Sequence, residues 1–137
     1  MSIKDLYPLA EKAPDRVKTP TGKSLADITL DAVLAGDVTV ADLAITPEAL
    51  LLQAEIALAG GRHTLAENFH RAAELVTIPQ DVIMETYEML RPGRADRKTL
   101  HAQAEVLRST YQAELLAKFI EEAAVAYERR GIFAKRY

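Results

Sequence analysis

Apolar residues recur every three or four positions from residue 47 to residue 130, which is the spacing of one face of an α-helix. The pattern predicts a first long helix that begins at Thr46-Pro47-Glu48, because threonine caps helix N-termini and proline fits the first helical position. This helix extends to about Val76. Gly60-Gly61 lies in its middle, and each glycine costs ~1 kcal/mol relative to alanine, so the sequence allows a bend or a break there.

Two further helices are predicted in the C-terminal half. The first starts at Pro79 and ends at Arg91-Pro92-Gly93, because the residue before a proline is pushed out of the helical region. The second starts near Asp96, a suitable N-cap, and continues to Arg130 with a helical period throughout. Its second half has extra apolar residues that widen the apolar face, and we expect part of that face to contact another chain. The added residues are Leu116, Ile120, Ala124 and Tyr127.

The first 46 residues are punctuated by proline and glycine, so no long helix is expected there. Residues 30–35 are predicted to form a short helix that Thr29 caps and Gly36 stops, and a second turn is expected after Thr39. No alternation typical of β-strands is sustained. We therefore predict an all-α chain with a single domain over residues 1–137, made of an irregular arm (1–46) and a helical bundle (47–137).

Composition and charge narrow the class of protein. Hydrophobic residues make up 49% of the 137 residues, which is enough apolar surface for a folded core. The formal net charge of -3 gives no attraction to nucleic acid or to an anionic membrane, so neither is expected as a partner. The absence of cysteine excludes disulfides, iron–sulfur clusters and thiolate zinc sites. No membrane span or signal peptide is recognisable, and we expect a cytoplasmic protein.

One constellation has the spacing of metal ligands. His63, Glu67, His70 and Glu74 lie at i, i+4, i+7 and i+11 and share one side of a helix. Glu67 and His70 form the Glu-x-x-His unit that occurs twice in helical di-iron proteins. The sequence has no second copy to complete the coordination shell. We therefore interpret this side of the helix as solvated or as a polar contact with a partner, and assign no metal ligand.

The sequence offers no arrangement for nucleophilic catalysis. A Gly-x-Ser-x-Gly motif is absent. Residues 19–24, Thr-Pro-Thr-Gly-Lys-Ser, resemble the end of a phosphate-binding loop, but Val17 occupies the position that the motif's first glycine requires. We interpret this segment as a solvated turn. No catalytic or cofactor-binding residue is assigned in the chain.

Ordered blocks of sequence resemble a known family over nearly the whole chain. The blocks are Tyr7-Pro8-Leu9-Ala10, residues 19–30, Val33-Leu34-Ala35-Gly36, Gly61-Arg62-His63, residues 65–69, residues 71–75, Ile78-Pro79, Tyr87, Leu90-Arg91-Pro92, Tyr111-Gln112-Ala113, and Phe119 with Glu122-Ala123-Ala124. Jointly they are similar to the small (gamma) subunit of coenzyme B12-dependent glycerol and propanediol dehydratases.

The resemblance implies a fold, a set of partners and a cofactor. It implies an open up-and-down three-helix bundle with an irregular N-terminal arm. The enzyme would be a lyase that converts a vicinal diol to an aldehyde and water by radical chemistry. Its large (alpha) subunit would be a barrel with the catalytic residues, and adenosylcobalamin would lie between the large and medium (beta) subunits. This chain would brace the assembly without catalytic residues of its own, in a dimer of heterotrimers.

Six residues are predicted to be partner contacts or core: Leu6, Tyr7, Leu9, Leu25, Ile28 and Phe119. An arm with little regular backbone pairing would be ordered by burying its apolar residues on a neighbour. Only six residues precede Tyr7, whereas some relatives have a longer extension that looks like a microcompartment signal, so we expect free cytoplasm or encapsulation through other subunits. The alternative is a stand-alone helical binding module, metal-loaded through His63, Glu67 and His70.

Overall fold

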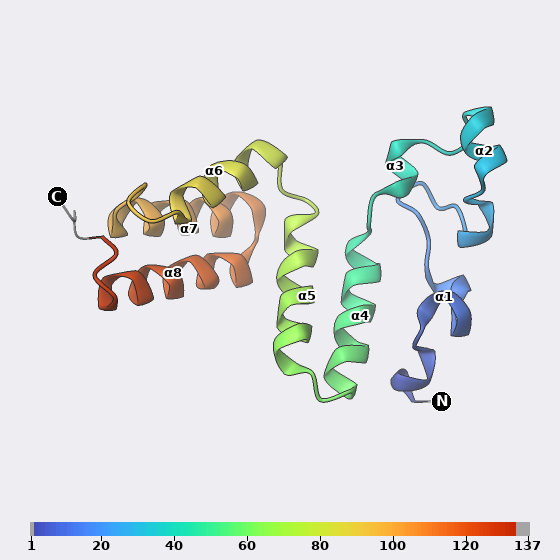
Figure 1. The fold of residues 1–137 in the computed structure, drawn as a ribbon, viewed down its shortest axis with the longest axis horizontal. Coiled ribbons are helices and arrows are strands. Elements are labelled where there is room, and N and C mark those ends of the chain that lie inside the picture. The colour runs from blue at the N-terminus through green and yellow to red at the C-terminus, as the bar shows by residue number, and fades with distance from the viewer. Residues whose placement is uncertain (1, 134–137) are drawn as a thin grey trace. The chain divides into compact units, whose positions relative to one another are not determined.

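A computed structural model describes residues 2–133, and its regular secondary structure is helical (Figure 1). Within these residues no β-strand occurs, and a single isolated bridge joins Lys18 and Ser24. The prediction of an all-α chain is therefore confirmed. The chain divides into two compact units, residues 1–76 and residues 77–137, and each is described below by itself. The prediction of a single domain stays a prediction.

The first unit contains a helical hairpin of α4 (Pro47–Ala59) and α5 (His63–Leu75), which pack side by side (Figure 1). Helix α4 begins as predicted, because the Thr46 hydroxyl accepts a hydrogen bond of 3.2 Å from the Ala49 amide. The chain reverses direction at the two glycines, where the sequence allowed a bend or a break. Gly61 has a φ of +76°, a value that glycine adopts without steric cost. Small side chains, Ala54, Ala57 and Ala66, form the buried core of this pair, and Phe69 packs against them.

The arm of the first unit consists of short helical segments rather than open coil. They are η1 (Ile3–Leu6), α1 (Leu9–Lys12), η2 (Pro14–Arg16), η3 (Leu25–Asp27), α2 (Leu30–Ala35) and α3 (Val40–Leu43). The predicted short helix is confirmed as α2: the Thr29 hydroxyl accepts from the Ala32 amide at 3.2 Å, and Gly36 ends the helix with a φ of +81°. The turn expected after Thr39 is α3.

The second unit contains α6 (Gln80–Leu90), α7 (Arg97–Tyr111) and α8 (Glu114–Arg129). Asp96 caps α7 as predicted, because its carboxylate accepts from the Thr99 amide at 2.7 Å, which lowers its pKa. Two polar contacts tie α6 to the others. The buried Gln103 amide donates to the Thr86 hydroxyl at 2.8 Å, and the Tyr127 hydroxyl donates to the Leu90 carbonyl at 2.6 Å.

The single helix predicted from Asp96 to Arg130 is wrong, because the chain turns at Gln112. Gln112 has a φ of +53°, in the left-handed region that ends a helix, and α7 and α8 pack against each other on either side of it. The three aliphatic residues of the widened face, Leu116, Ile120 and Ala124, are buried within the chain. These three are therefore core residues and do not form the predicted contact with another chain.

Arg108 joins α7 to α8 through hydrogen-bonded ion pairs. Its guanidinium donates to Glu121 at 2.9 Å, Glu105 at 2.8 Å and Glu114 at 2.7 Å, so one cation on α7 binds two carboxylates of α8. These hydrogen bonds raise the pKa of Arg108 above its ordinary value and lower the pKa of Glu114. At the other end of the pair Arg97 binds Glu128, which shows that the two helices are antiparallel.

An up-and-down three-helix bundle is not confirmed. The long segments 47–76 and 96–130 each fold back on themselves as a helical hairpin instead of forming one helix each. When a segment folds back on itself, its two halves form two helices that pack against each other. Apolar residues that would lie on different sides of one long helix are then buried between these two helices.

Substitution at Gln112 tests the reversal between α7 and α8. Gln112→Gly should raise the free energy of unfolding by ~0.5–1 kcal/mol, because glycine adopts a positive φ without the steric cost of a Cβ. Gln112→Val should lower it by ~1 kcal/mol or more, because a β-branched residue fits this region worst. Urea unfolding followed by circular dichroism measures both. Equal stability of the glycine and valine variants would contradict a left-handed Gln112.

Candidate partner interface

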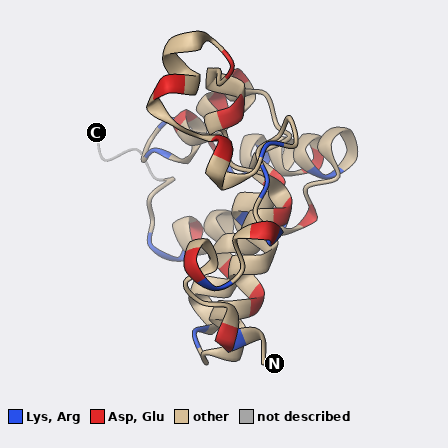
Figure 2. Cartoon of the chain, turned by 90° about the vertical axis from the view of Figure 1, so that its right-hand side faces the viewer, with Lys and Arg blue, Asp and Glu red and all other residues tan. Residues whose placement is uncertain are grey.

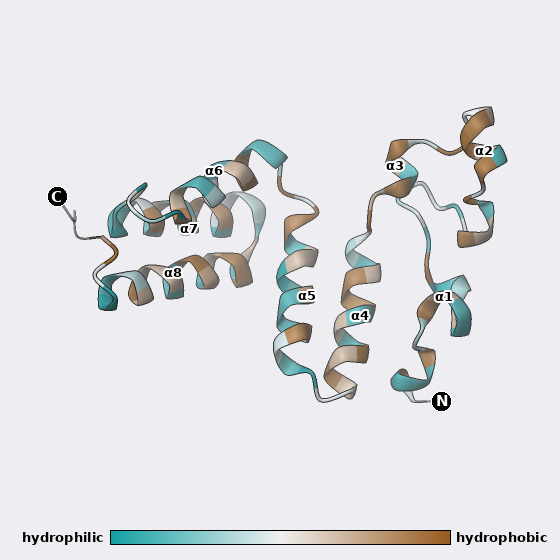
Figure 3. Ribbon diagram, in the orientation of Figure 1, coloured by the Kyte–Doolittle hydropathy of each residue, from teal (hydrophilic) through white to brown (hydrophobic). Residues whose placement is uncertain are grey.

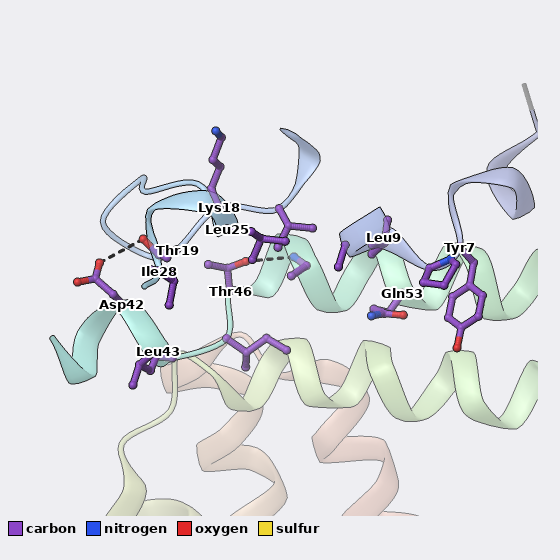
Figure 4. Close-up of a pocket in the computed structure, with 16 residues that line it drawn as sticks. Tyr7, Leu9, Lys18, Thr19, Leu25, Ile28, Asp42, Leu43, Thr46 and Gln53 are labelled. Carbon is purple, nitrogen blue, oxygen red and sulfur yellow. Dashed lines mark hydrogen bonds between the residues drawn. The ribbon is translucent and has the colours of Figure 1, made fainter. Parts of the chain in front are cut away.

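A groove of about 690 Å³ lies between the arm and the start of α4 (Figure 4). Four of the six predicted contact or core residues line it, namely Tyr7, Leu9, Leu25 and Ile28. Side chains of α3 and α4 complete the lining, among them Leu43, Ala49 and Gln53. The structure thus brings together residues that are up to 46 positions apart in the sequence, from Tyr7 to Gln53, on one largely apolar surface.

The six predicted residues differ in exposure. Leu9 is buried, and Leu6 and Ile28 are half-buried. Tyr7 is 63% exposed, and Leu25 is 37% exposed. Phe119 is also partly exposed and lies on α8 in the second unit. Leu9 is therefore a core residue of the chain, whereas partner contact by the others stays a prediction.

The groove is bounded by a buried carboxylate, that of Asp42, which binds four other residues. The Thr19 hydroxyl donates to it at 3.2 Å, the Lys23 ammonium lies 3.2 Å from both of its oxygens, and the Thr39 amide donates at 2.9 Å. The Thr21 hydroxyl donates to the same carboxylate. We call this group of five residues the Asp42 clasp. It joins the turn at residues 19–23 to α3 across about 20 residues of sequence.

The environment of Asp42 favours its charged form. Hydrogen bonds from the Thr21 hydroxyl and the Thr39 amide hold the pKa of the carboxyl well below its usual range, and Lys23 lowers it further. Burial acts in the opposite direction but is outweighed. Asp42 is therefore an anion at neutral pH, and it is bound to a cation and to several donors.

The clasp explains residues 19–24. The segment is a turn, as predicted: the Gly22 amide donates to the Thr19 carbonyl at 2.9 Å, and Gly22 has a φ of +90°. Its polar side chains are not simply solvated, however, because Thr19, Thr21 and Lys23 bind Asp42. Those groups already bind an anion of the chain itself, so the likeness to a phosphate-binding loop has no functional meaning here.

Sequence reasoning missed Asp42. A local signal for it exists, because Thr39-Val40-Ala41-Asp42 is a capping box at the start of α3, in which the Asp42 side chain accepts from the Thr39 amide. The capping box predicts a helix start. It does not predict the long-range donors Thr19, Thr21 and Lys23, which only the folded arm brings to the same carboxylate.

The suspected metal ligands lie on one helix as predicted. His63, Glu67, His70 and Glu74 all belong to α5. Among residues 2–133, no three His, Asp or Glu side chains converge so that they could hold a metal ion. The structure therefore gives no support to a metal-loaded binding module.

Charged residues of both signs are interspersed along much of the chain (Figure 2). No helix of the described part of the chain is long and apolar enough to cross a membrane. The candidate binding surface of the first unit is apolar. It consists of the groove and the exposed aliphatic residues around it. An exposed apolar surface of this kind is typical of a protein that binds another protein.

Comparison with known proteins identifies the kind of assembly. Residues 1–134 match the family described as dehydratase small subunit. The chain belongs to this family. It is 52% identical over 124 residues to the propanediol dehydratase small subunits of Citrobacter freundii and of Salmonella typhimurium strain LT2. Each alignment covers 90% of this chain and 72% of the relative.

The resemblance inferred from sequence blocks is thus confirmed. As a dehydratase small subunit the chain is part of an enzyme complex of the lyase class and has other subunits as partners. A chain that works in a complex has contact surfaces for its neighbours, and the apolar groove of the first unit is a candidate for one of them.

The Asp42 clasp gives a test of how the small subunit orders its arm. Asp42→Asn removes the anion that Lys23 and the donors of the clasp bind, and at pH 7 it should lower the melting temperature of the small subunit by ~5 °C. The control Asp31→Asn, at an exposed acid of α2, should change it by less than ~1 °C. Thermal unfolding monitored by circular dichroism measures both.

The same variant has a predicted pH dependence. The folded-state pKa of Asp42 is depressed, so its stabilisation is present above the unfolded pKa of ~4 and is lost as the pH falls toward the folded value. The difference in melting temperature between the unmodified chain and Asp42→Asn should therefore shrink progressively below pH ~4. A difference that stays constant down to pH 2.5 would show that the charge of Asp42 does not stabilise the fold.

Proposed function

We propose that this chain is the non-catalytic small (gamma) subunit of an adenosylcobalamin-dependent diol dehydratase. The enzyme converts a vicinal diol, glycerol or propane-1,2-diol, to an aldehyde and water. The observation that supports this most strongly is the 52% identity to two propanediol dehydratase small subunits over 90% of the chain. The partners are a large (alpha) and a medium (beta) subunit, in a dimer of heterotrimers.

The family match also supports treating the chain as one functional domain. It extends over residues 1–134 and so covers the first compact unit and nearly all of the second. In this proposal residues 1–137 are a single small-subunit domain that braces the large subunit. Tyr7, Leu25, Ile28 and Phe119 are exposed or half-buried apolar residues suited to that contact, and Leu6, in η1, is also half-buried.

Adenosylcobalamin and the diol belong to the other subunits in this proposal. When bound, the cofactor supplies the radical that starts the reaction. The residues that line the groove of this chain are mainly apolar, and its polar members include Lys18, Thr19, Asp42, Thr46 and Gln53. The Asp42 carboxylate is already bound within the clasp, and the lining has no histidine or cysteine, so it does not form a donor set for a cobalt ion. We assign the chain a structural role and propose that it works in the cytoplasm, where other subunits could bring the enzyme into a microcompartment.

The alternative reading, a stand-alone helical binding module, is not favoured by the comparisons. It would require a folded chain with stoichiometric metal bound through His63, Glu67 and His70. Metal analysis of the purified chain, before and after His70→Ala, tests that reading directly.

Reconstitution tests the proposed role. The large and medium subunits should be co-expressed with and without this chain, and aldehyde formation from propane-1,2-diol and from glycerol measured after addition of adenosylcobalamin. Omission of the chain should lower the activity by at least ~10-fold, because the assembly loses the stabilisation that a bound partner supplies. The purified chain should show no activity by itself. Unchanged activity without the chain, together with no co-sedimentation, would contradict the proposal.

A further inference from the structure

Helix α3 has an inverted distribution of polar and apolar side chains. Its one buried residue is Asp42, which is 4% exposed, whereas Val40 is 85% exposed and Leu43 is 64% exposed. Helix α2 buries no residue at all, and its Leu30 and Leu34 are 73% and 77% exposed. A helix of a monomeric protein normally turns its aliphatic side to the core and its acids to water.

The Asp42 clasp is the cause of this inversion. Lys23 and the clasp threonines hold the carboxylate inward, and the aliphatic residues of α3 then point to solvent. Figure 3 shows hydrophobic colouring along α2 and α3. We call the exposed aliphatic residues of these helices and of the residue before α4 the α2–α3 apolar surface. It consists of Leu30, Val33, Leu34, Val40, Leu43 and Ile45.

The stretch of sequence that carries this surface has charges of one sign only. From residue 24 to residue 61 the sequence has six acidic residues and no lysine or arginine. The nearest cation before this stretch, Lys23, is bound to Asp42. The apolar surface is therefore flanked by acids such as Asp31 and Asp37, which are exposed. A surface that binds it well has an apolar centre and a border of lysine and arginine.

We infer that the α2–α3 apolar surface is a docking surface for another subunit of the dehydratase, whose contact area is apolar and bordered by basic residues. The inference rests on the proposed function. An anionic membrane or a nucleic acid would be repelled by the same acids. A second copy of this chain would bring two acidic borders together, which disfavours self-association through this surface.

The test uses the complex of this chain with the large and medium subunits. Leu30 and Val40 are the first residues of α2 and α3, where an acidic side chain is compatible with the helix dipole, so the double variant Leu30→Asp/Val40→Asp should fold normally. Its affinity for the other subunits should fall by ~30-fold or more, as expected for apolar contacts at the centre of an interface. Titration calorimetry measures the affinity, and circular dichroism checks the fold.

The matched control is Val125→Asp on α8, where the valine is 54% exposed. It should change the affinity by less than ~3-fold, as expected for a residue outside the interface. An equal or larger loss for Val125→Asp, or an unchanged affinity for the folded Leu30→Asp/Val40→Asp variant, would overturn the inference and leave the proposed function intact. No binding by the unmodified chain would overturn both.

The charge of the border is tested separately with Asp31→Lys/Asp37→Lys. Reversal of these exposed charges should weaken binding by ~10-fold at 50 mM NaCl and by less than ~2-fold at 500 mM, because salt screens charges at the edge of an interface. A loss that does not depend on salt, or tighter binding, would overturn the basic border. Sedimentation of the isolated chain adds a last outcome: a dimer that Leu30→Asp/Val40→Asp dissociates would assign the surface to a second copy and overturn the inference.

Discussion

The turn at residues 19–23 and helix α3 of this small subunit are joined by one buried anion. A buried carboxylate is costly unless donors and a countercharge surround it, and Asp42 is bound by three side chains of the turn at residues 19–23 and by the Thr39 amide. The helical segments of the arm are three to six residues long, so their own backbone hydrogen bonds order them weakly. The Asp42 clasp supplies a long-range contact between two parts of the arm, the turn at residues 19–23 and α3.

A polar centre in the arm has a consequence for the surface. Because the carboxylate occupies the interior position of α3, the neighbouring aliphatic residues Val40 and Leu43 lie outside. The groove lined by Tyr7, Leu25 and Ile28 adds a second apolar surface in the same unit. Such exposed surfaces suit a chain that is part of a dehydratase complex, since burial by a partner would stabilise them.

The two helical hairpins are held together by different contacts. The α4–α5 pair is built on alanines, which let two helices approach closely, and the α7–α8 pair is joined by Arg108 and its three glutamates. Both pairs reverse at a residue with positive φ, Gly61 in one and Gln112 in the other. Each hairpin therefore has contacts of its own between its two helices, whereas the arm leaves many of its large apolar residues exposed.

The sequence by itself determined the helical class, the caps Thr29, Thr46 and Asp96, and the family, because periodicity, capping and ordered motifs are local properties of the chain. The sequence predicted Tyr7, Leu9, Leu25 and Ile28 to be contact or core residues, but it did not predict that they line one groove. Tertiary structure decided the reversal at Gln112, where no glycine marks the turn and burial between α7 and α8 offsets the steric cost of ~1–2 kcal/mol. It also decided the role of Asp42, because the donors that bury this acid are about 20 residues away in the sequence and meet it only after folding.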